Sequence, residues 1–232
     1  MKQKKIRVAV IDSGIDTQIS SLSECIKDFT AYEINEQGYI QENKKIPVRN
    51  LHGTLVSMII HNICPEIELI SVNILDENLE TEGRVLLYAL SRVFDYKPDI
   101  IHMSLGTLSK KYIFSFKKIV REANKKKVLI VAAAGPIGKK SYPAYLRGVF
   151  GVKILWEKKH YQYKYEKGFF YAPYDTKSIE KIQRIPEVKD EMGSSISAAY
   201  ITGEIAEILR EHQNLTYKDV KKLLVKRIVL EE

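Results

Sequence analysis

Short apolar runs recur along the chain, and each is rich in Val and Ile and mostly followed by Gly, Asp or Ser. Runs of this length and composition predict buried β-strands. The predicted strands cover residues 6–11, 68–74, 98–103, 128–134 and 149–155.

Amphipathic stretches with the apolar spacing of helices separate these runs. The predicted helices cover residues 52–62, 82–95, 109–126, 195–211 and 217–227. Thr216 is the candidate N-cap of the last helix, and Asp219 completes a pattern close to a capping box. Alternating strands and helices predict a parallel sheet with right-handed crossovers. We therefore expect one α/β domain over residues 1–232, a three-layer doubly wound, mostly parallel sheet with helices on both faces.

Residues 156–171 carry seven aromatic side chains among lysines. Tyr161, Tyr163 and Tyr165 alternate with polar residues, which is typical of a half-buried hairpin strand. Basic segments with aromatic residues also bind single-stranded nucleic acid. Of these two interpretations we favour the hairpin.

Composition places the chain among ordinary globular proteins and excludes collagen-like, mucin-like and disordered ones. Of 232 residues, 45% are hydrophobic and 28% are charged. No run of about 18 apolar residues is present, and the first apolar run is too short for a signal peptide, so we expect a cytoplasmic protein without a membrane span. Cys25 and Cys64 are expected to be buried, unpaired thiols, and no Cys/His cluster suggests zinc.

The net charge of +8 is compatible with nucleic acid and with acidic peptides alike. No Gly-x-Gly-x-x-Gly or P-loop pattern follows a predicted strand, which disfavours a nucleotide-binding enzyme. We expect no nucleic acid partner. His102 lies inside a predicted strand and is expected to be a hydrogen-bonded core residue.

Candidate chemistry lies at the carboxyl ends of the strands, where α/β sheets bind their ligands. Asp12 ends the first strand, and a carboxylate buried there needs a partner. His52 opens an apolar helix, and Ser195 stands at another helix start, among free backbone N–H groups. Each residue alone is more typical of a turn or a cap. Together, Asp, His and Ser are the parts of an activated nucleophile.

The residues around these three positions resemble the subtilases, the subtilisin-like serine peptidases. The matching motifs are Val8-Ala9-Val10-Ile11-Asp12-Ser13-Gly14, His52-Gly53-Thr54, Ile101-His102-Met103-Ser104-Leu105-Gly106 and Gly193-Ser194-Ser195-Ile196-Ser197-Ala198. The resemblance implies that Ser195 attacks a peptide carbonyl and that His52 shuttles its proton. It also implies that Asp12 orients the imidazole and stabilises the imidazolium.

The resemblance further implies how substrate binds. Ser104, Leu105 and Gly106 would pair with an extended peptide as an added strand, and Ala133, Ala134 and Gly135 would form the other wall of the specificity pocket. We therefore expect an intracellular serine endopeptidase without a cofactor. Its partner would be a peptide or protein substrate with a bias towards acidic sequences, and removal of a leader peptide is one candidate task.

The chain departs from the family at Pro136, where the family usually has an asparagine that donates to the oxyanion. Proline offers no donor, and losing one such donor costs about 10²–10³ in kcat. The backbone N–H of Ser195 would remain. Three alternatives follow: a slow enzyme helped by substrate binding, a donor supplied by another loop, or a peptide-binding pseudoprotease. The intact Asp12, His52 and Ser195 favour catalysis.

Two further departures concern calcium and the N-terminus. The segment 61–65 passes almost directly into the next strand, so the family's calcium loop is expected to be missing. Asp16 is then a turn or capping residue, and we expect no metal there. The chain begins at its first strand, so we expect it to fold without a propeptide.

Overall fold

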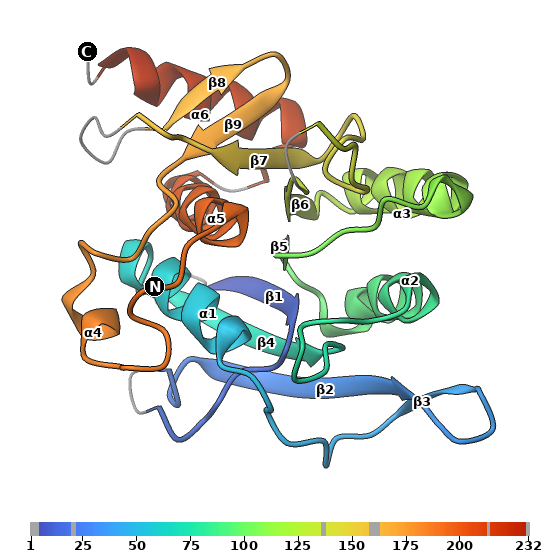
Figure 1. Ribbon diagram of the computed structural model, residues 1–232. Coiled ribbons are helices and arrows are strands. Elements are labelled where there is room, and N and C mark those ends of the chain that lie inside the picture. Colours follow the sequence, from blue (N-terminus) through green and yellow to red (C-terminus); the bar gives the residue numbers. More distant parts are fainter. Residues whose placement is uncertain (1–4, 20–21, 136–137, 158–162, 213, 231–232) are drawn as a thin grey trace.

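A nine-stranded sheet forms the centre of the protein in the computed structural model (Figure 1). The structure describes residues 5–19, 22–135, 138–157, 163–212 and 214–230. The strand order is β3-β2-β4-β1-β5-β6-β7-β9-β8, and its outer strands are β2 (Ile26–Ile34), β3 (Ile40–Glu42), β8 (Lys164–Glu166) and β9 (Phe169–Ala172). The inner strands are β1 (Ile6–Asp12), β4 (Ile67–Asn73), β5 (Ile100–Met103), β6 (Leu129–Ala133) and β7 (Phe150–Ile154). These are the five predicted strands, and they pair in parallel.

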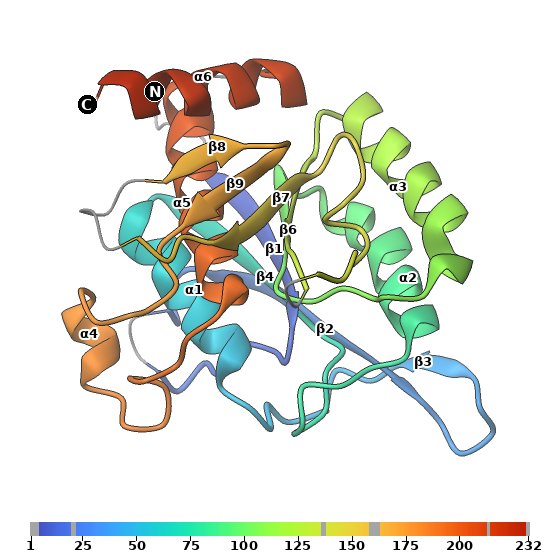
Figure 2. The same ribbon diagram turned by 45° about the horizontal axis from the view of Figure 1, so that its top comes forward.

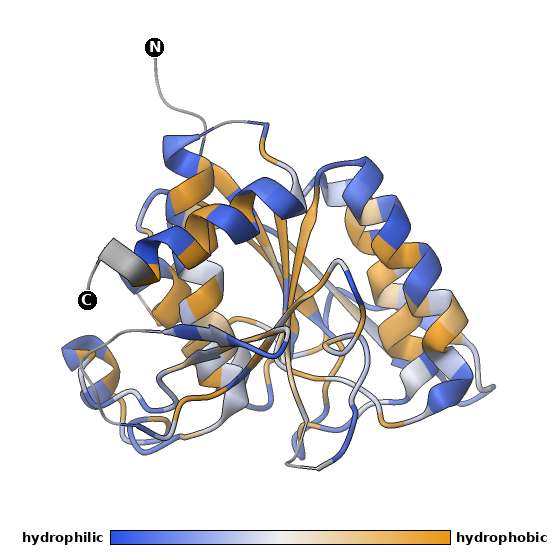
Figure 3. Cartoon of the chain, turned by 90° about the horizontal axis from the view of Figure 1, so that it is seen from above, coloured by the Kyte–Doolittle hydropathy of each residue, from blue (hydrophilic) through white to orange (hydrophobic). Residues whose placement is uncertain are grey.

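Helices cover both faces of the sheet, as predicted. One face carries α1 (His52–Ile63), α5 (Ser194–Glu211) and α6 (Tyr217–Leu230), and the other carries α2 (Gly83–Arg92) and α3 (Ile113–Lys125). Figure 2 shows the two helical layers on either side of the strands. The apolar faces of the helices turn towards the sheet and their polar faces turn outwards (Figure 3). Each helical layer therefore packs against one face of the sheet and buries a separate hydrophobic core there.

Two predicted helices begin or end in a tighter 3-10 turn. The stretch 82–95 divides into α2 and η1 (Val93–Tyr96), which ends where Lys97 adopts a left-handed conformation, with φ of 51°. The stretch 109–126 begins with η2 (Lys110–Tyr112), which leads into α3. Such turns are common at helix termini, so the pattern located the helices but not their ends.

The edges of the sheet contain elements that the hydrophobic pattern did not predict. β2 (Ile26–Ile34) pairs with β4 in parallel and with β3 (Ile40–Glu42) in antiparallel fashion. The short helix α4 (Glu180–Gln183) was also not predicted. β2 was missed because it is only partly buried, with Phe29 53% exposed, so its sequence lacks a continuous apolar run.

The hairpin interpretation of the aromatic segment is confirmed for its described part. β8 (Lys164–Glu166) and β9 (Phe169–Ala172) pair in antiparallel fashion. Lys167 and Gly168 join them with φ angles of 48° and 88°, which are the left-handed values of a tight two-residue hairpin turn. Tyr163 is buried, whereas Tyr161 lies outside the described residues.

Several local predictions are confirmed. Thr216 and Asp219 form the capping box of α6: the Thr216 N–H donates to the Asp219 carboxylate at 2.9 Å, and the Asp219 N–H donates to the Thr216 hydroxyl at 3.4 Å. Cys25 and Cys64 are buried free thiols. Among the described helices, none combines the length and apolar character that a membrane span requires.

The sheet register brings the candidate residues to one edge. Ile11 pairs with Met103, and Met103 pairs with Ala132. The residues that follow, Asp12 and Ser104, therefore end neighbouring parallel strands at the same carboxyl edge. Val8 and Val10 pack in the core under α1 and α5, and strand alternation places Asp12 on that same face.

Candidate active site

Asp12 and His52 form a buried hydrogen-bonded pair at the carboxyl edge of the sheet. His52 Nδ1 lies 2.9 Å from Asp12 Oδ1. The Asp12 side chain is fully buried, and that of His52 is 13% exposed. An ionised carboxylate only accepts hydrogen bonds, so Nδ1 carries the proton and Nε2 is the free basic nitrogen.

The start of α1 is fixed by short polar contacts with the loop after β1. The Asn50 side chain accepts a hydrogen bond from the His52 N–H at 2.9 Å. The Ser13 hydroxyl donates to the Asn50 carbonyl at 2.8 Å and accepts from the Gly53 N–H at 3.0 Å. These contacts hold the imidazole against Asp12, so Ser13 and Asn50 are positioning residues that the sequence analysis did not identify.

Gly53 has to be glycine for this approach. A Cβ at residue 53 would collide with the carbonyl oxygen of Gly14 and lie 3.2 Å from Asp12 Cβ. We expect Gly53→Ala to lower the free energy of unfolding by about 1–3 kcal/mol through overpacking. Thermal unfolding would show this as a Tm lowered by roughly 2–10 °C. An unchanged Tm would contradict the close approach of α1 to the Gly14 loop.

The two members of the pair shift each other's protonation. Burial alone raises the pKa of the Asp12 carboxyl, but the His52 ring and the Ser13 N–H outweigh burial and hold it below 3.8. Burial alone lowers the pKa of His52, but the Asp12 carboxylate outweighs burial and holds it above 6.5. Asp12 Oδ2 is buried and has no hydrogen-bond partner among the described residues. The pair therefore favours an ionised carboxylate beside a base of raised proton affinity.

Ser195 lies in the first turn of α5, on the same face of the sheet as Asp12 and α1. It is half-buried, and among the described residues its hydroxyl has no hydrogen-bond partner. Its backbone N–H belongs to the first helical turn, where N–H groups lack intrahelical acceptors and favour negative charge. The neighbouring Ser194 hydroxyl donates to the Ala134 carbonyl at 2.8 Å, which ties the helix start to the end of β6.

The six residues predicted to bind substrate line one cavity of about 700 Å³. One wall is Ser104, Leu105 and Gly106, and the other is Ala133, Ala134 and Gly135. Gly193 and Ser194 bound the cavity next to Ser195. The cavity also contains side chains that the sequence analysis did not assign to a site: Leu108, Ser141, Tyr145, Lys153, Ile154, Trp156 and Tyr171.

His102 is the core residue that its strand position predicted. Its Nδ1 lies 2.8 Å from the Thr202 hydroxyl on α5, and its Nε2 lies 2.9 Å from the Ser104 hydroxyl. Because the Thr202 hydroxyl donates to the Ala198 carbonyl, it accepts from Nδ1–H, and the Ser104 hydroxyl donates to Nε2. Burial lowers the pKa of His102 to about 4, which keeps the ring neutral and able to bridge α5 to the cavity wall.

Of the predicted departures from the family, the structure describes Asp16 but not Pro136. Asp16 is the turn residue that we expected, since its carboxylate accepts from the Gln18 N–H at 2.8 Å. The part of the chain that the structure describes contains no group of three potential metal-ligating side chains. Pro136, the departure at the oxyanion position, lies outside the described residues.

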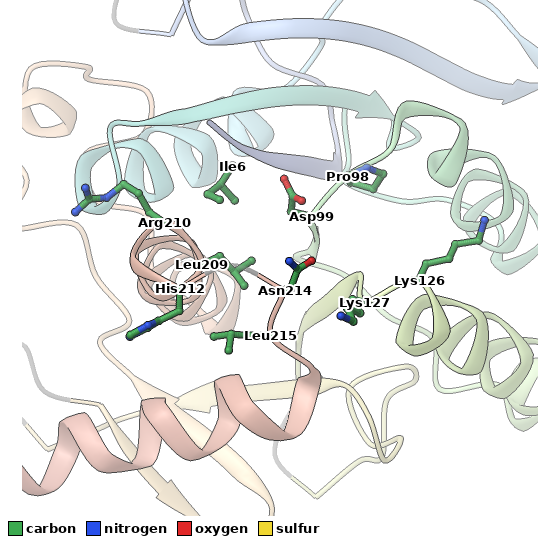
Figure 4. A pocket seen from close by; sticks show the side chains of 10 residues that line it. All are labelled: Ile6, Pro98, Asp99, Lys126, Lys127, Leu209, Arg210, His212, Asn214 and Leu215. Atoms are coloured by element: carbon green, nitrogen blue, oxygen red, sulfur yellow. The ribbon is translucent and has the colours of Figure 1, made fainter. Parts of the chain in front are cut away.

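A second cavity, of about 270 Å³, lies at the opposite end of the sheet. It is lined by residues at the amino ends of the strands and at or beyond the C-terminal end of α5, among them Ile6, Asp99, Leu209 and Asn214 (Figure 4). The backbone N–H of Arg7 already donates to the Asp99 carboxylate at 2.9 Å. Since ligands of such sheets bind beyond the carboxyl ends of the strands, the candidate chemistry belongs to the larger cavity.

Solved structures of subtilisin-like proteases share this fold. A lanthipeptide protease matches 94% of this chain and 78% of its own, with a TM-score of 0.68 and 19% identity. A cold-adapted subtilisin-like serine proteinase matches 96% and 81%, with a TM-score of 0.73 and 17% identity. At these identities the matches show the fold alone.

Sequence comparison places the chain in a family. Two proteins of Bacillus subtilis strain 168 are each 32% identical to it: the minor extracellular protease Epr over 67% of this chain and 24% of that protein, and the major intracellular serine protease over 66% and 51%. The chain thus spans between a quarter and about half of the relatives' lengths. The model of the subtilase family matches residues 3–160. The chain therefore belongs to the subtilase family, which confirms the family that the resemblance indicated.

Proposed function

We propose that this subtilase is a serine endopeptidase that uses Asp12, His52 and Ser195 to cleave an extended peptide. The observation that carries the proposal is the 2.9 Å contact between His52 and a fully buried Asp12, on the face of the sheet where Ser195 lies in the first turn of α5. A buried carboxylate that orients an imidazole is the arrangement that prepares a base for a neighbouring hydroxyl.

The chemistry follows from the protonation states. His52 Nε2 accepts the proton of the Ser195 hydroxyl as Oγ attacks the peptide carbonyl carbon. The imidazolium is stabilised by the ionised Asp12, and it returns the proton to the leaving amine. Water then attacks the acyl-enzyme by the same route. The Ser195 N–H, at the positive end of α5, stabilises the oxyanion.

Hydrolysis of an unfolded protein tests the endopeptidase proposal. The full chain is incubated with a reduced, denatured protein, and new termini are mapped by mass spectrometry. We expect internal cleavages in the wild type and none with Ser195→Ala. Absence of cleavage by a folded wild type, or cleavage by both proteins, would contradict the proposal.

Pro136 provides a test of the oxyanion site. We expect Pro136→Asn to raise kcat, by up to about 10²-fold, because the amide adds a donor where the family carries one. Pro136→Ala is the matched control, since it removes the ring without adding a donor. Equal rates for the two variants in a peptide-hydrolysis assay would contradict this placement of residue 136.

A binding protein that captures a peptide without cutting it is the second candidate. Two observations favour it: Pro136 removes a donor, and the Ser195 hydroxyl is unpartnered among the described residues. In free enzymes, however, catalytic hydrogen bonds often form fully only with substrate. The intact Asp12–His52 pair therefore favours the peptidase.

We further propose that the cleavage is limited, as in removal of a leader peptide, and occurs inside the cell. One protein of the same fold is a lanthipeptide protease, and one relative is an intracellular protease by name. The buried free thiols of Cys25 and Cys64 are compatible with a reducing compartment. The net charge of +8 supports a bias towards acidic peptides that salt would weaken.

A further inference from the structure

The cavity beside Ser195 is the place where the side chain that precedes the cleaved bond would lie. Gly193 and Ser194, immediately before Ser195, form part of its lining. A peptide carbonyl placed at the Ser195 hydroxyl would therefore have its own side chain at the mouth of this cavity. The chemical character of the cavity then selects the residue on the acyl side of the bond.

Lys153, on β7, is the only charged side chain among the described residues that line this cavity. Its ammonium lies 3.9 Å from the centre of the Phe169 ring, 5.3 Å from that of Tyr145 and 5.9 Å from that of Tyr171. Tyr145 and Tyr171 line the cavity as well. The faces of these rings stabilise the cation, and two of the three rings belong to residues of the cavity lining.

No carboxylate neutralises Lys153 among the residues that the structure describes. Lys164 on β8 differs in this respect. It flanks the other side of Tyr171, with its ammonium 5.5 Å from the ring centre, but it forms an ion pair with Glu157 at 3.3 Å. Since the aromatic rings compensate only part of the lost hydration, Lys153 retains the capacity to bind an anion.

Ser141 adds a hydrogen-bond donor to the same cavity. It is 2% exposed, and its hydroxyl oxygen accepts from the Gly135 N–H at 2.6 Å. Its hydroxyl proton has no acceptor among the described residues. An ammonium and a buried hydroxyl donor in a mostly apolar cavity are complementary to a carboxylate.

We infer that Lys153 makes this cavity selective for an acidic side chain, glutamate or aspartate, immediately before the cleaved bond. The inference rests on the proposed peptidase function and deepens it by naming the substrate class. It also localises the general bias expected from the net charge to one side chain.

A matched peptide series tests the inference. The peptides are identical except for Glu, Gln, Leu or Lys before the cleaved bond, and kcat/KM is measured with the full chain. We expect Glu to exceed the isosteric Gln by about ten- to a hundredfold, and Lys to be the poorest substrate. With Lys153→Met the Glu/Gln ratio should fall close to one, whereas Lys153→Arg should retain the preference.

Lys164→Met is the matched control. It removes a cation of equal charge on the other side of Tyr171 that does not line the cavity, so the Glu/Gln ratio should stay at the wild-type value. A wild type that cleaves Glu and Gln peptides equally would overturn the inference. An unchanged ratio in folded Lys153→Met would overturn it too.

Binding to Ser195→Ala separates this inference from the proposed function. The dissociation constants of the uncleaved Glu and Gln peptides are measured with this variant and with Ser195→Ala/Lys153→Met. Selective binding of Glu through Lys153, together with a folded wild type that cleaves none of the peptides, would overturn the peptidase proposal and support the role of the cavity. Cleavage without selectivity would overturn the role of Lys153 alone.

Discussion

Replacing Ser195 with alanine should lower kcat for peptide hydrolysis about 10⁶-fold. The substitution removes the atom that forms the acyl-enzyme and leaves only what substrate binding and the oxyanion contacts contribute. Because the hydroxyl has no hydrogen-bond partner among the described residues, its loss should leave the folded state intact. Steady-state hydrolysis and thermal unfolding of the same preparations would measure both effects.

Ser194 provides the matched control for this substitution. Its hydroxyl donates to the Ala134 carbonyl at 2.8 Å, so Ser194→Ala removes one structural hydrogen bond next to the proposed nucleophile. We expect that variant to keep most of its activity, with a stability loss of about 1 kcal/mol. Comparable losses of activity in Ser194→Ala and Ser195→Ala would count against a nucleophile at residue 195.

Asp12→Asn should lower kcat about 10⁴-fold and change its pH dependence. An amide removes the negative charge that stabilises the imidazolium. Its NH₂ group donates to Nδ1, which favours the His52 tautomer that carries its proton on Nε2. Only neutral His52 can accept the proton of Ser195, so activity falls as pH drops through the pKa of His52. Asp12 raises that pKa above 6.5, so the acidic limb of the wild-type profile should lie above pH 6.5.

In Asp12→Asn the residual activity should persist to lower pH, because the charge that raised the pKa of His52 is gone. A pH profile of kcat/KM for both proteins measures the shift. His102→Gln gives a second comparison. Because burial lowers the pKa of His102 to about 4, this ring is already neutral, and its replacement should leave the acidic limb of the pH profile unchanged. An identical acidic limb in Asp12→Asn and the wild type would contradict the assignment of the base.

The inner strands could be predicted from the sequence because burial on both faces leaves a continuous apolar run. β2 could not, because it is half-exposed and the consecutive charged residues Lys27 and Asp28 interrupt its apolar positions. Its place in the sheet depends on long-range pairing with β4. Local patterns carry no information on such pairing.

Some residues of the candidate site could likewise be predicted from the sequence, and others could not. Asp12 and His52 could be predicted because short motifs at strand and helix ends carry them, and their contact is now seen at 2.9 Å. Lys153 could not be predicted, since its surroundings depend on the register that sets Lys153 opposite Tyr171 and on the return of Tyr145 to the same place. Lys153 lies in an otherwise apolar run, which predicts a buried strand rather than a binding residue.

Covalent labelling with a fluorophosphonate probe tests the central claim most directly, because the probe reacts with an activated serine and needs no knowledge of the substrate. The full chain is treated with the probe, and adducts are located by mass spectrometry. The proposed mechanism predicts one adduct, on Ser195, that is absent from Ser195→Ala and forms slowly in Asp12→Asn. A folded wild-type protein that remains unlabelled, or an adduct that persists in Ser195→Ala, would contradict it.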